Sequence, residues 1–294
     1  MLRDFAAVFR FEVARMLGSF RALLVLLLYA SATTLIGLFY VSVVRGLEEQ
    51  AVEMLAKQGG AGAARGVVDI TQTEAYRNLI QSITGGDSAK AEFWLATPPM
   101  VLVSFWLALA AMPWLVSFVA HDVIARDTES RTLRFVRPKT PIESWVLGKF
   151  AAHSILILTV SVLSAIELYA IGLAKLETFD ATAGLIGFAQ FWPRLLVYEV
   201  GFLGITFALS AVARTSFSAL MSGGMALFGL WILQFFSAFK DNPLSYLQYV
   251  SPFAYNTMLL NPIGVPLAEA LGAYLLFAGL GLGLCIQQLK TRDV

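Results

Sequence analysis

The sequence predicts an all-α integral membrane protein with six transmembrane helices, an amphipathic helix before the first of them and a polar helix between the second and the third. Three observations support this. Hydrophobic residues make up 58% of the 294 residues and charged residues only 14%, whereas soluble domains have about 45–50% and about 25%. The mean hydropathy is +0.72. Six apolar runs are each long enough to cross a bilayer core of about 30 Å. We expect one transmembrane domain over residues 1–294.

Composition and motifs exclude several classes of function. A net charge of +1 gives no global field that would attract nucleic acid. Neither the phosphate-binding Gly-x-x-x-x-Gly-Lys-Ser/Thr loop nor a His-Glu-x-x-His or Gly-x-Ser-x-Gly motif occurs. Cys285, the single cysteine, excludes an internal disulfide, and with only His121 and His153 it leaves little for a zinc or haem site. We therefore expect no enzyme activity, no cofactor and no metal, and interpret these three residues as packing or surface.

Residues 1–20 predict an amphipathic helix that lies in the membrane interface. At about 100° per residue, its apolar side chains fall within one narrow arc, with Arg3 and Arg10 roughly opposite. The arc contains Leu2, Phe5, Phe9, Val13, Met16 and Phe20. A signal peptide is the alternative, because residues 30–32 (Ala-Ser-Ala) resemble a cleavage site. The apolar run continues well beyond them, which favours a first span at about 22–44.

The segment 45–96 is mostly polar and is predicted to be an extracytoplasmic loop. Helical pieces are expected at about 46–58 and 71–83, and glycines between and after them mark breaks. The segment is too short and too broken for a domain with its own core.

The other five spans follow from the remaining apolar runs, at about 98–120, 150–173, 191–212, 217–239 and 266–286. Pro113 should kink the second span. We expect a short loop at 174–190 and a polar-aromatic loop at 240–265. In that second loop Pro243 and Pro252 would break longer helices, so short re-entrant helices are an option.

Small residues indicate close helix contacts in two spans. Gly279 and Gly283 are spaced as Gly-x-x-x-Gly in the sixth span, and Gly204 and Ala208 have the same spacing in the fourth. Such pairs let helices approach closely. We expect these contacts within one subunit; a contact between subunits is the alternative.

The distribution of positive charge predicts which side of the membrane holds the chain ends. Six spans put both ends and the loop 121–149 on one side, which carries 13 of the 21 lysines and arginines, and the other side carries 8. Short cytoplasmic loops are enriched in these residues. We therefore expect a multi-pass protein of the bacterial cytoplasmic membrane with both ends in the cytoplasm.

Glu167 and Glu199 lie inside predicted spans. A carboxylate there costs about 2.5–3.5 kcal/mol on insertion scales, so it should face the bundle interior, a partner or water. One interpretation is a polar lining of a translocation path, or a proton site. The other is a buried carboxylate satisfied by Arg194, Tyr198 or a serine on a neighbouring helix.

The loop 121–149 is too charged for lipid and too apolar for a free linker. Its pattern predicts a helix at about 122–136 that Pro138 and Pro141 stop. Such a helix can lie along the inner membrane surface and present a rigid surface to a soluble protein. The alternative is a plain loop helix that contacts acidic lipid.

The order of residues in this loop is informative. It contains Asp122, Ile124, Glu129, Thr132-Leu133, Pro138 and Leu147-Gly148-Lys149. This resembles the loop of type-2 ABC exporter permeases, which typically reads as an acid, a Glu-x-x-x-Gly-Thr-Leu-like segment, a proline and Leu-Gly-Lys. The interfacial helix, the six spans, Ser251-Pro252 before the last span and the tail Lys290–Asp293 fit the same layout.

Two positions depart from that pattern. Arg131 stands where these permeases usually have a glycine before Thr-Leu. The usual arginine shortly after the proline is missing and is replaced by the segment Lys139–Glu143. Both departures concern the fine contacts of the loop.

The resemblance implies that the loop contains a cytoplasmic coupling helix, which docks into a cleft of a separate cytoplasmic ABC ATPase subunit. Two permeases, identical or paralogous, would pair with two ATPases, and closure of the ATPases on ATP would reorganise the path between the permeases. The residues it implies for ATPase coupling are Asp122, Glu129, Thr132, Leu133, Phe135 and Pro138. The permease itself would bind no ATP.

Two other classes of function stay open. One is a proton- or ion-coupled secondary transporter that uses Glu167 and Glu199, and the other is a non-transporting membrane scaffold. The apolar spans would suit a lipid, a hydrophobic drug or a peptide as substrate, and no residue selects among them.

Overall fold

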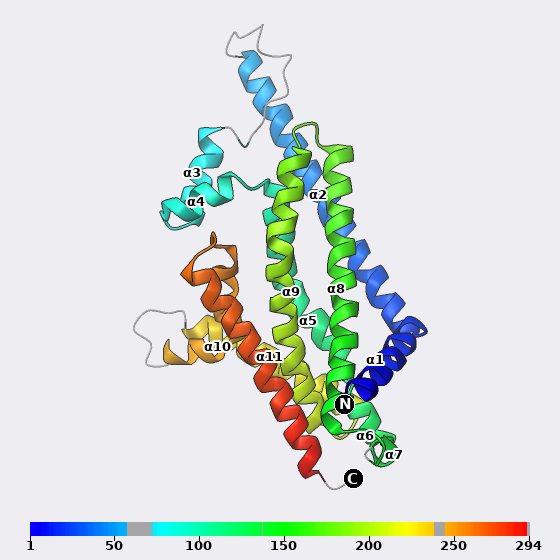
Figure 1. Cartoon of the computed structure of the whole chain (residues 1–294). Helices are drawn as coiled ribbons and strands as arrows, with labels where there is room; N and C mark the ends of the chain where they lie inside the picture. Colours follow the sequence, from blue (N-terminus) through cyan, green and yellow to red (C-terminus); the bar gives the residue numbers. More distant parts are fainter. Residues whose placement is uncertain (58–70, 72, 137, 238–244, 293–294) are drawn as a thin grey trace. The chain divides into compact units, whose positions relative to one another are not determined.

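The computed structural model describes residues 1–57, 71, 73–136, 138–237 and 245–292 (Figure 1). Helices dominate these residues, and none of them forms a strand, so the all-α prediction is confirmed. The helices are α1 (Leu2–Leu17), α2 (Phe20–Lys57), α3 (Glu74–Ile83), α4 (Ser88–Leu95), α5 (Pro99–Ala120), α6 (Ala125–Glu129), α7 (Leu133–Val136), α8 (Ile142–Lys175), α9 (Ala181–Val212), α10 (Ser216–Ser237), the 3₁₀ helices η2 (Ser245–Val250) and η3 (Pro252–Leu260), and α11 (Val265–Thr291).

Six helical segments of the described chain are long and apolar enough to cross a membrane. They are Leu23–Gln50, Pro99–Glu129, Ile142–Lys175, Ala181–Val212, Ser216–Phe236 and Val265–Thr291. The predicted number of spans is confirmed. Several predicted features lie outside the described residues, namely the glycine breaks near residue 60, the end of the fifth span and Pro243.

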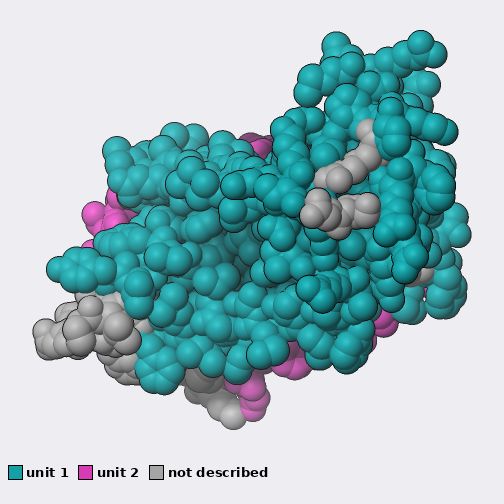
Figure 2. Space-filling view, turned by 90° about the horizontal axis from the view of Figure 1, so that it is seen from below, with its two compact units in different colours: residues 1–26, 109–159, 194–294 teal, residues 27–108, 160–193 magenta. Residues whose placement is uncertain are grey.

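The chain forms two compact units, which Figure 2 shows in two colours. Unit 1 comprises Met1–Leu26, Leu109–Thr159 and Arg194–Val294, and unit 2 comprises Leu27–Ala108 and Val160–Pro193.

In unit 1, α9 and α11 touch through their backbones. A Cβ on Gly204 would lie 2.8 Å from the carbonyl oxygen of Ala278, and a Cβ on Gly281 would collide with the backbone of Gly204. The contact expected at Gly204 is therefore present within one subunit. The expectation of a contact within one subunit is wrong for Gly279 and Gly283, because a Cβ on either would meet no described atom within 4 Å. The alternative, a contact between subunits, stays a prediction for these two glycines. The glycine that faces α9 lies between them.

The start of α1 and the end of α11 lie at the same end of unit 1, next to the start of α8 (Figure 1). The Ser144 hydroxyl donates to the carbonyl oxygen of Met1 at 3.3 Å. The Lys290 ammonium forms an ion pair with Glu143. One turn of α8 therefore holds both helices.

The polar-aromatic segment before α11 folds into η2 and η3, which agrees with the short helices considered for this loop. The Ser251 hydroxyl donates to the carbonyl oxygen of Leu230 on α10 at 2.9 Å. The Tyr274 hydroxyl on α11 donates to the carbonyl oxygen of Pro252 at 2.8 Å. These bonds attach the segment to both neighbouring helices of unit 1.

In unit 2, an apolar cluster holds α2, α5 and α8 together, and Phe179 packs against it. Its buried members are Val41, Met100, Leu168 and Leu176. The helical piece expected at 46–58 is a continuation of α2, which runs to Lys57. The piece expected at 71–83 is present as α3, whereas α4 was not predicted.

The α9 helix begins ten residues before the predicted fourth span. The Asp180 carboxylate accepts hydrogen bonds from the backbone N–H groups of Thr182 at 2.8 Å and Ala183 at 3.0 Å. This is an N-terminal cap, which satisfies donors that the first helical turn leaves unpaired. The loop predicted at 174–190 is therefore too long.

Candidate functional site

The segment between α5 and α8 contains two short helices, so the prediction of one helix at 122–136 is wrong. The α6 helix ends in a Schellman motif. The N–H of Thr132 donates to the carbonyl oxygen of Asp127 at 2.9 Å, and the N–H of Arg131 donates to that of Thr128 at 3.1 Å. This closure requires a left-handed residue, and Arg131 has a φ of +57°. The chain then reverses into α7.

The beginning of this segment is fixed to α9. Val123, Ile124 and Ala125 are all at most 1% exposed. The backbone N–H groups of Ile124 and Ala125 both donate to the Ser210 hydroxyl oxygen at 3.1 Å. The turn after α5 therefore has little freedom to move apart from α9.

A buried ion cluster joins α1, α6 and α8. The Lys149 ammonium nitrogen lies 2.6 Å from a carboxylate oxygen of Glu12 on α1 and 2.6 Å from one of Asp127 on α6. The side chains of Lys149 and Glu12 are 1% and 2% exposed. The Arg15 guanidinium adds a second cation, at 2.9 Å from Glu12 and 3.7 Å from Asp127.

The charges of this cluster balance, with two cations and two carboxylates. Buried charges cost several kcal/mol each unless they are paired and hydrogen-bonded. Lys149 has two further contacts. It donates to the carbonyl oxygen of Val123 at 3.2 Å, and its ammonium lies 4.7 Å from the centre of the Trp145 ring. The cluster is therefore a specific site in which each cation contacts both acids.

The sequence-predicted coupling residues divide into exposed and buried ones. Phe135 on α7 is 74% exposed, although it is a large apolar side chain. Thr132 and Pro138 are also exposed. Leu133 is 4% exposed and so belongs to the support of α7. The surface that the segment offers is therefore centred on Phe135.

Glu129 and Asp122, the two acids of the predicted set, have other surroundings. One carboxylate oxygen of Glu129 accepts hydrogen bonds from the backbone N–H of Ser216 at 2.9 Å and from its hydroxyl at 2.8 Å. Glu129 thereby caps the start of α10, where a negative charge is favourable. Asp122 is half-buried and lines a cavity.

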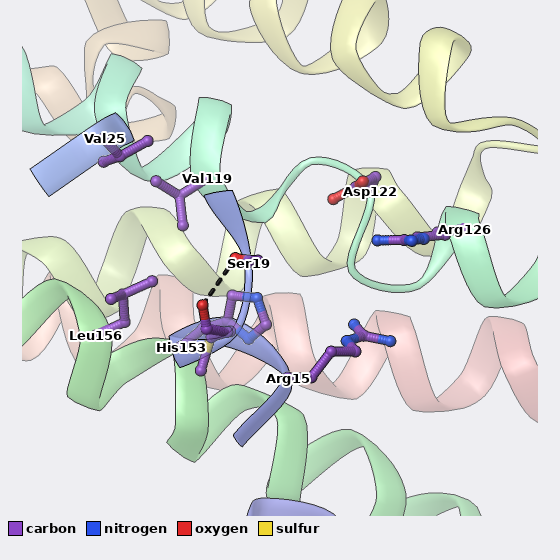
Figure 3. A pocket seen from close by; sticks show the side chains of 9 residues that line it. Arg15, Ser19, Val25, Val119, Asp122, Arg126, His153 and Leu156 are labelled. Atoms are coloured by element: carbon purple, nitrogen blue, oxygen red, sulfur yellow. Dashed lines mark hydrogen bonds between the residues drawn. The ribbon is translucent and has the colours of Figure 1, made fainter. Parts of the chain in front are cut away.

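This cavity, of about 90 Å³, lies between the α1–α2 turn, the end of α5 and α8 (Figure 3). Its lining combines charged, polar and apolar side chains. They are Arg15, Met16, Ser19, Val25, Val119, Asp122, Arg126, His153 and Leu156. In Figure 3 the charged groups of Arg15, Asp122 and Arg126 lie on one side, and Val25, Val119 and Leu156 lie on the other.

The two intramembrane acids lie in different units. In unit 2, half-buried Glu167 accepts a hydrogen bond from the Thr34 hydroxyl. In unit 1, Glu199 on α9 is 1% exposed. Arg194, which the sequence offered as a partner for these acids, donates to the carbonyl oxygens of Leu259 and Asn261 at 2.8 Å each.

The histidines make short local contacts. Nδ1 of His121 lies 2.8 Å from the carbonyl oxygen of Phe118, and Nδ1 of His153 lies 2.9 Å from that of Lys149. Within the described part of the chain, no three His, Cys, Asp or Glu residues are grouped so that they could hold a metal ion. The absence of a metal or cofactor stays a prediction.

Comparison with known families gives the class of the protein. Residues 7–261 match the family model described as ABC-2 family transporter protein. The chain belongs to the ABC-2 transporter family. A search of curated proteins found no match.

Family membership makes the chain the membrane-embedded permease component of an ABC transporter. Permeases of this family are membrane components and not themselves the ATPases, and membership implies association with an ABC ATPase. The matched residues include the whole segment between α5 and α8 and all four members of the ion cluster.

The sequence interpretation gave no role to several polar residues that organise this part of the permease, among them Glu12, Arg15 and Asp127 of the ion cluster and Ser210. Glu12 follows Phe5 by seven residues and so lies on the same face of α1. An acid on the apolar arc of an amphipathic helix was the available signal. Ser210, near the end of the fourth span, carried no comparable signal, because a serine in a membrane helix has many other roles.

Proposed function

We propose that this permease is the membrane-spanning subunit of an ATP-driven exporter and that the segment 121–149 couples it to a separate cytoplasmic ATPase subunit. In this proposal α6 and α7 form the coupling element, in the cytoplasm together with both chain ends. The host membrane is a bacterial cytoplasmic membrane. Two permeases, identical or paralogous, assemble with two ATPases, and Glu167 and Glu199 belong to the translocation path.

The observation that carries this proposal is the exposed Phe135 on an anchored support. A large aromatic side chain that is 74% exposed is typical of a residue that another protein covers. Leu133 anchors α7 through its buried side chain. The hydrogen bonds to Ser210 and the ion cluster attach the first part of the segment to the neighbouring helices. A force on α7 would therefore act on helices that cross the membrane.

Co-purification tests the proposal. The permease is purified in nanodiscs, and its dissociation constant for a candidate ABC ATPase from the same genome is measured for wild type and Phe135→Asp. We expect the Kd to rise at least about tenfold, because a central aromatic residue typically contributes about 2 kcal/mol to binding.

Tyr246→Asp is the matched control. Tyr246 is 81% exposed in η2, a segment that we place on the outer side of the membrane. Its substitution should leave the Kd unchanged. Equal Kd values for wild type and Phe135→Asp would contradict the coupling role of α7. Substrate movement by the purified permease alone along a proton gradient would instead favour a secondary transporter.

A further inference from the structure

We propose that Lys149 is a positioning residue that locks the amphipathic helix α1 to the coupling segment, so that α1 and α6 move as one body. The role of this lock in transmitting movement rests on the proposed function, whereas the contacts that form the lock do not depend on it. Leu147-Gly148-Lys149 lies in the second turn of α8, and the coupling role by itself assigns no task to its lysine.

The first step of the argument is the position of the three charges. Glu12 comes from α1, Asp127 from α6 and Lys149 from α8. Lys149 contacts both carboxylates at 2.6 Å and is 1% exposed, so water does not compete for these bonds. Removing the lysine would leave two buried carboxylates with one arginine. Movement of α6 away from α1 would separate the same charges and is therefore strongly disfavoured.

Gly148 supplies the second step. A Cβ at this position would lie 2.9 Å from Cβ of Val8 and 3.1 Å from the carbonyl oxygen of Phe5. The α1 helix therefore rests directly on α8 at Gly148, one residue before the lysine. The two residues act together, because Gly148 has no side chain and lets α1 pack directly against α8, and Lys149 forms an ion pair with Glu12 of α1.

The cavity beside the cluster supplies the third step. Arg15 and Met16 at the end of α1 and Ser19 after it line a space of about 90 Å³ together with Asp122 and Arg126. Figure 3 shows Arg15, Asp122 and Arg126 on one side of this space. Tight apolar packing does not join α1 to the start of the segment at this place. The link at this place is ionic, and the one cation that is fully buried in it is Lys149.

The consequence is a second route for the movement of the coupling segment. A displacement of α6 passes to α9 through Ser210, and it passes through Lys149 to α1, which leads directly into the first span. An ionic link is directional and breaks when its geometry is lost, so α1 follows α6 only while the cluster is intact.

Distance measurement between spin labels tests the lock in the full-length permease in nanodiscs. Labels are placed by Arg3→Cys on α1 and Arg126→Cys on α6 in a Cys285→Ala background, since Arg3 and Arg126 are exposed and Cys285 is the single cysteine. Arg3 lies about 18 Å along the helix from Arg15, which gives a measurable separation. When Lys149 is present, we expect one narrow peak in the distribution of distances between the two labels. In Lys149→Met we expect this narrow peak to be lost.

Two variants separate the lock from a folding defect. Lys149→Met combined with Asp127→Asn leaves Glu12 and Arg15, both on α1, as a balanced pair, so it should fold. No ion pair of the cluster then joins α1 to α6, and the narrow peak should still be lacking. Lys290→Met breaks the ion pair with Glu143 at the same end of unit 1 and should keep the peak. A narrow peak in the double variant would overturn the proposal.

The functional arm uses the complex with the ATPase. Lys149→Met with Asp127→Asn should bind the ATPase with wild-type Kd, because both side chains are buried, whereas permease-dependent stimulation of ATP hydrolysis should fall about tenfold, within the usual range for coupling between sites. Unchanged stimulation with a broadened distance would overturn the transmission role and keep the proposed function. Failure of the wild type to bind any ATPase would refute the proposed function and leave the distance test valid.

Discussion

Arg131 shows how one residue can set the form of a coupling element. Its φ of +57° lies in the left-handed region, which costs an L-residue other than glycine about 1–2 kcal/mol. Related permeases usually have glycine at this position by the resemblance described above. Arginine in place of glycine therefore strains the backbone locally, and the backbone hydrogen bonds of the Schellman motif hold Arg131 in this conformation.

Replacing Arg131 tests this strain. Arg131→Gly should stabilise the end of α6 by about 1 kcal/mol, which is the left-handed cost less the larger chain entropy that glycine loses on ordering. Hydrogen exchange of the Thr132 amide, which donates to Asp127, should slow about fivefold. Arg131→Ala removes the same side chain without relieving the backbone and should show no slowing. Equal exchange for the glycine and alanine variants would argue against strain.

Single residues of the site were predictable where the family pattern or the composition of the loop marks them. Phe135 stands out as an aromatic residue in a charged loop, and it is exposed. Ser216 as the partner of Glu129 and Glu12 as the partner of Lys149 were not predictable, because each pair is more than 80 positions apart and no local pattern links its members. A buried lysine and a surface lysine also look alike in a motif.

At the scale of helices, the contact between α9 and α11 depends on which face of a glycine-rich helix is buried. Three glycines follow one another at alternate positions in α11, and Gly281 is the one that meets Gly204. The spacing Gly-x-x-x-Gly drew attention to Gly279 and Gly283. Periodicity alone indicates that a helix can be approached closely and does not indicate from which side.

Substitutions by valine distinguish these faces. In Gly204→Val the new Cβ would lie 2.8 Å from the backbone oxygen of Ala278, which has no freedom to turn aside. We expect a loss of about 2 kcal/mol, seen as a lower thermal unfolding midpoint in detergent. Gly279→Val, which meets no described atom within 4 Å, should unfold near the wild-type midpoint. A reversed order would show that α11 is turned differently.

Helix boundaries were the least predictable elements. The early start of α9 depends on the cap at Asp180, and a sequence window that weighs only hydropathy passes over such a cap. The break between α6 and α7 depends on a left-handed arginine, which the usual preference of that region for glycine argues against. The cap at Asp180 is thus a local signal that hydropathy does not detect, whereas at Arg131 the backbone bonds of the folded chain override the local preference for glycine.

For the whole molecule, hydropathy was sufficient to predict six spans, because a membrane helix must satisfy its backbone internally and stay apolar along about 20 residues. The side of the membrane depends on the distribution of lysine and arginine alone. Met1 and Lys290 both contact the first turn of α8, so a single assignment of side decides the place of both chain ends.

Labelling of whole cells checks that assignment. In the Cys285→Ala background, Glu92→Cys on α4 should react with a membrane-impermeant maleimide in intact cells, because we place α3 and α4 outside. Lys139→Cys, between α7 and α8, should react only after the membrane is permeabilised. Both residues are exposed, so access to the reagent is limited by the bilayer. Labelling of Lys139→Cys in intact cells would invert the proposed orientation.

The ion cluster also sets an order of events during biosynthesis. Glu12 emerges early from the ribosome, and Lys149 follows 137 residues later, as the difference of their positions shows. At about 5–20 residues per second, this delay is on the order of 10 s. During that time the carboxylate of Glu12 has no buried cation to receive it and stays in contact with water or lipid headgroups. The amphipathic helix α1 is therefore synthesised first, and its Glu12 can pair with Lys149 only after the third span has begun to enter the membrane.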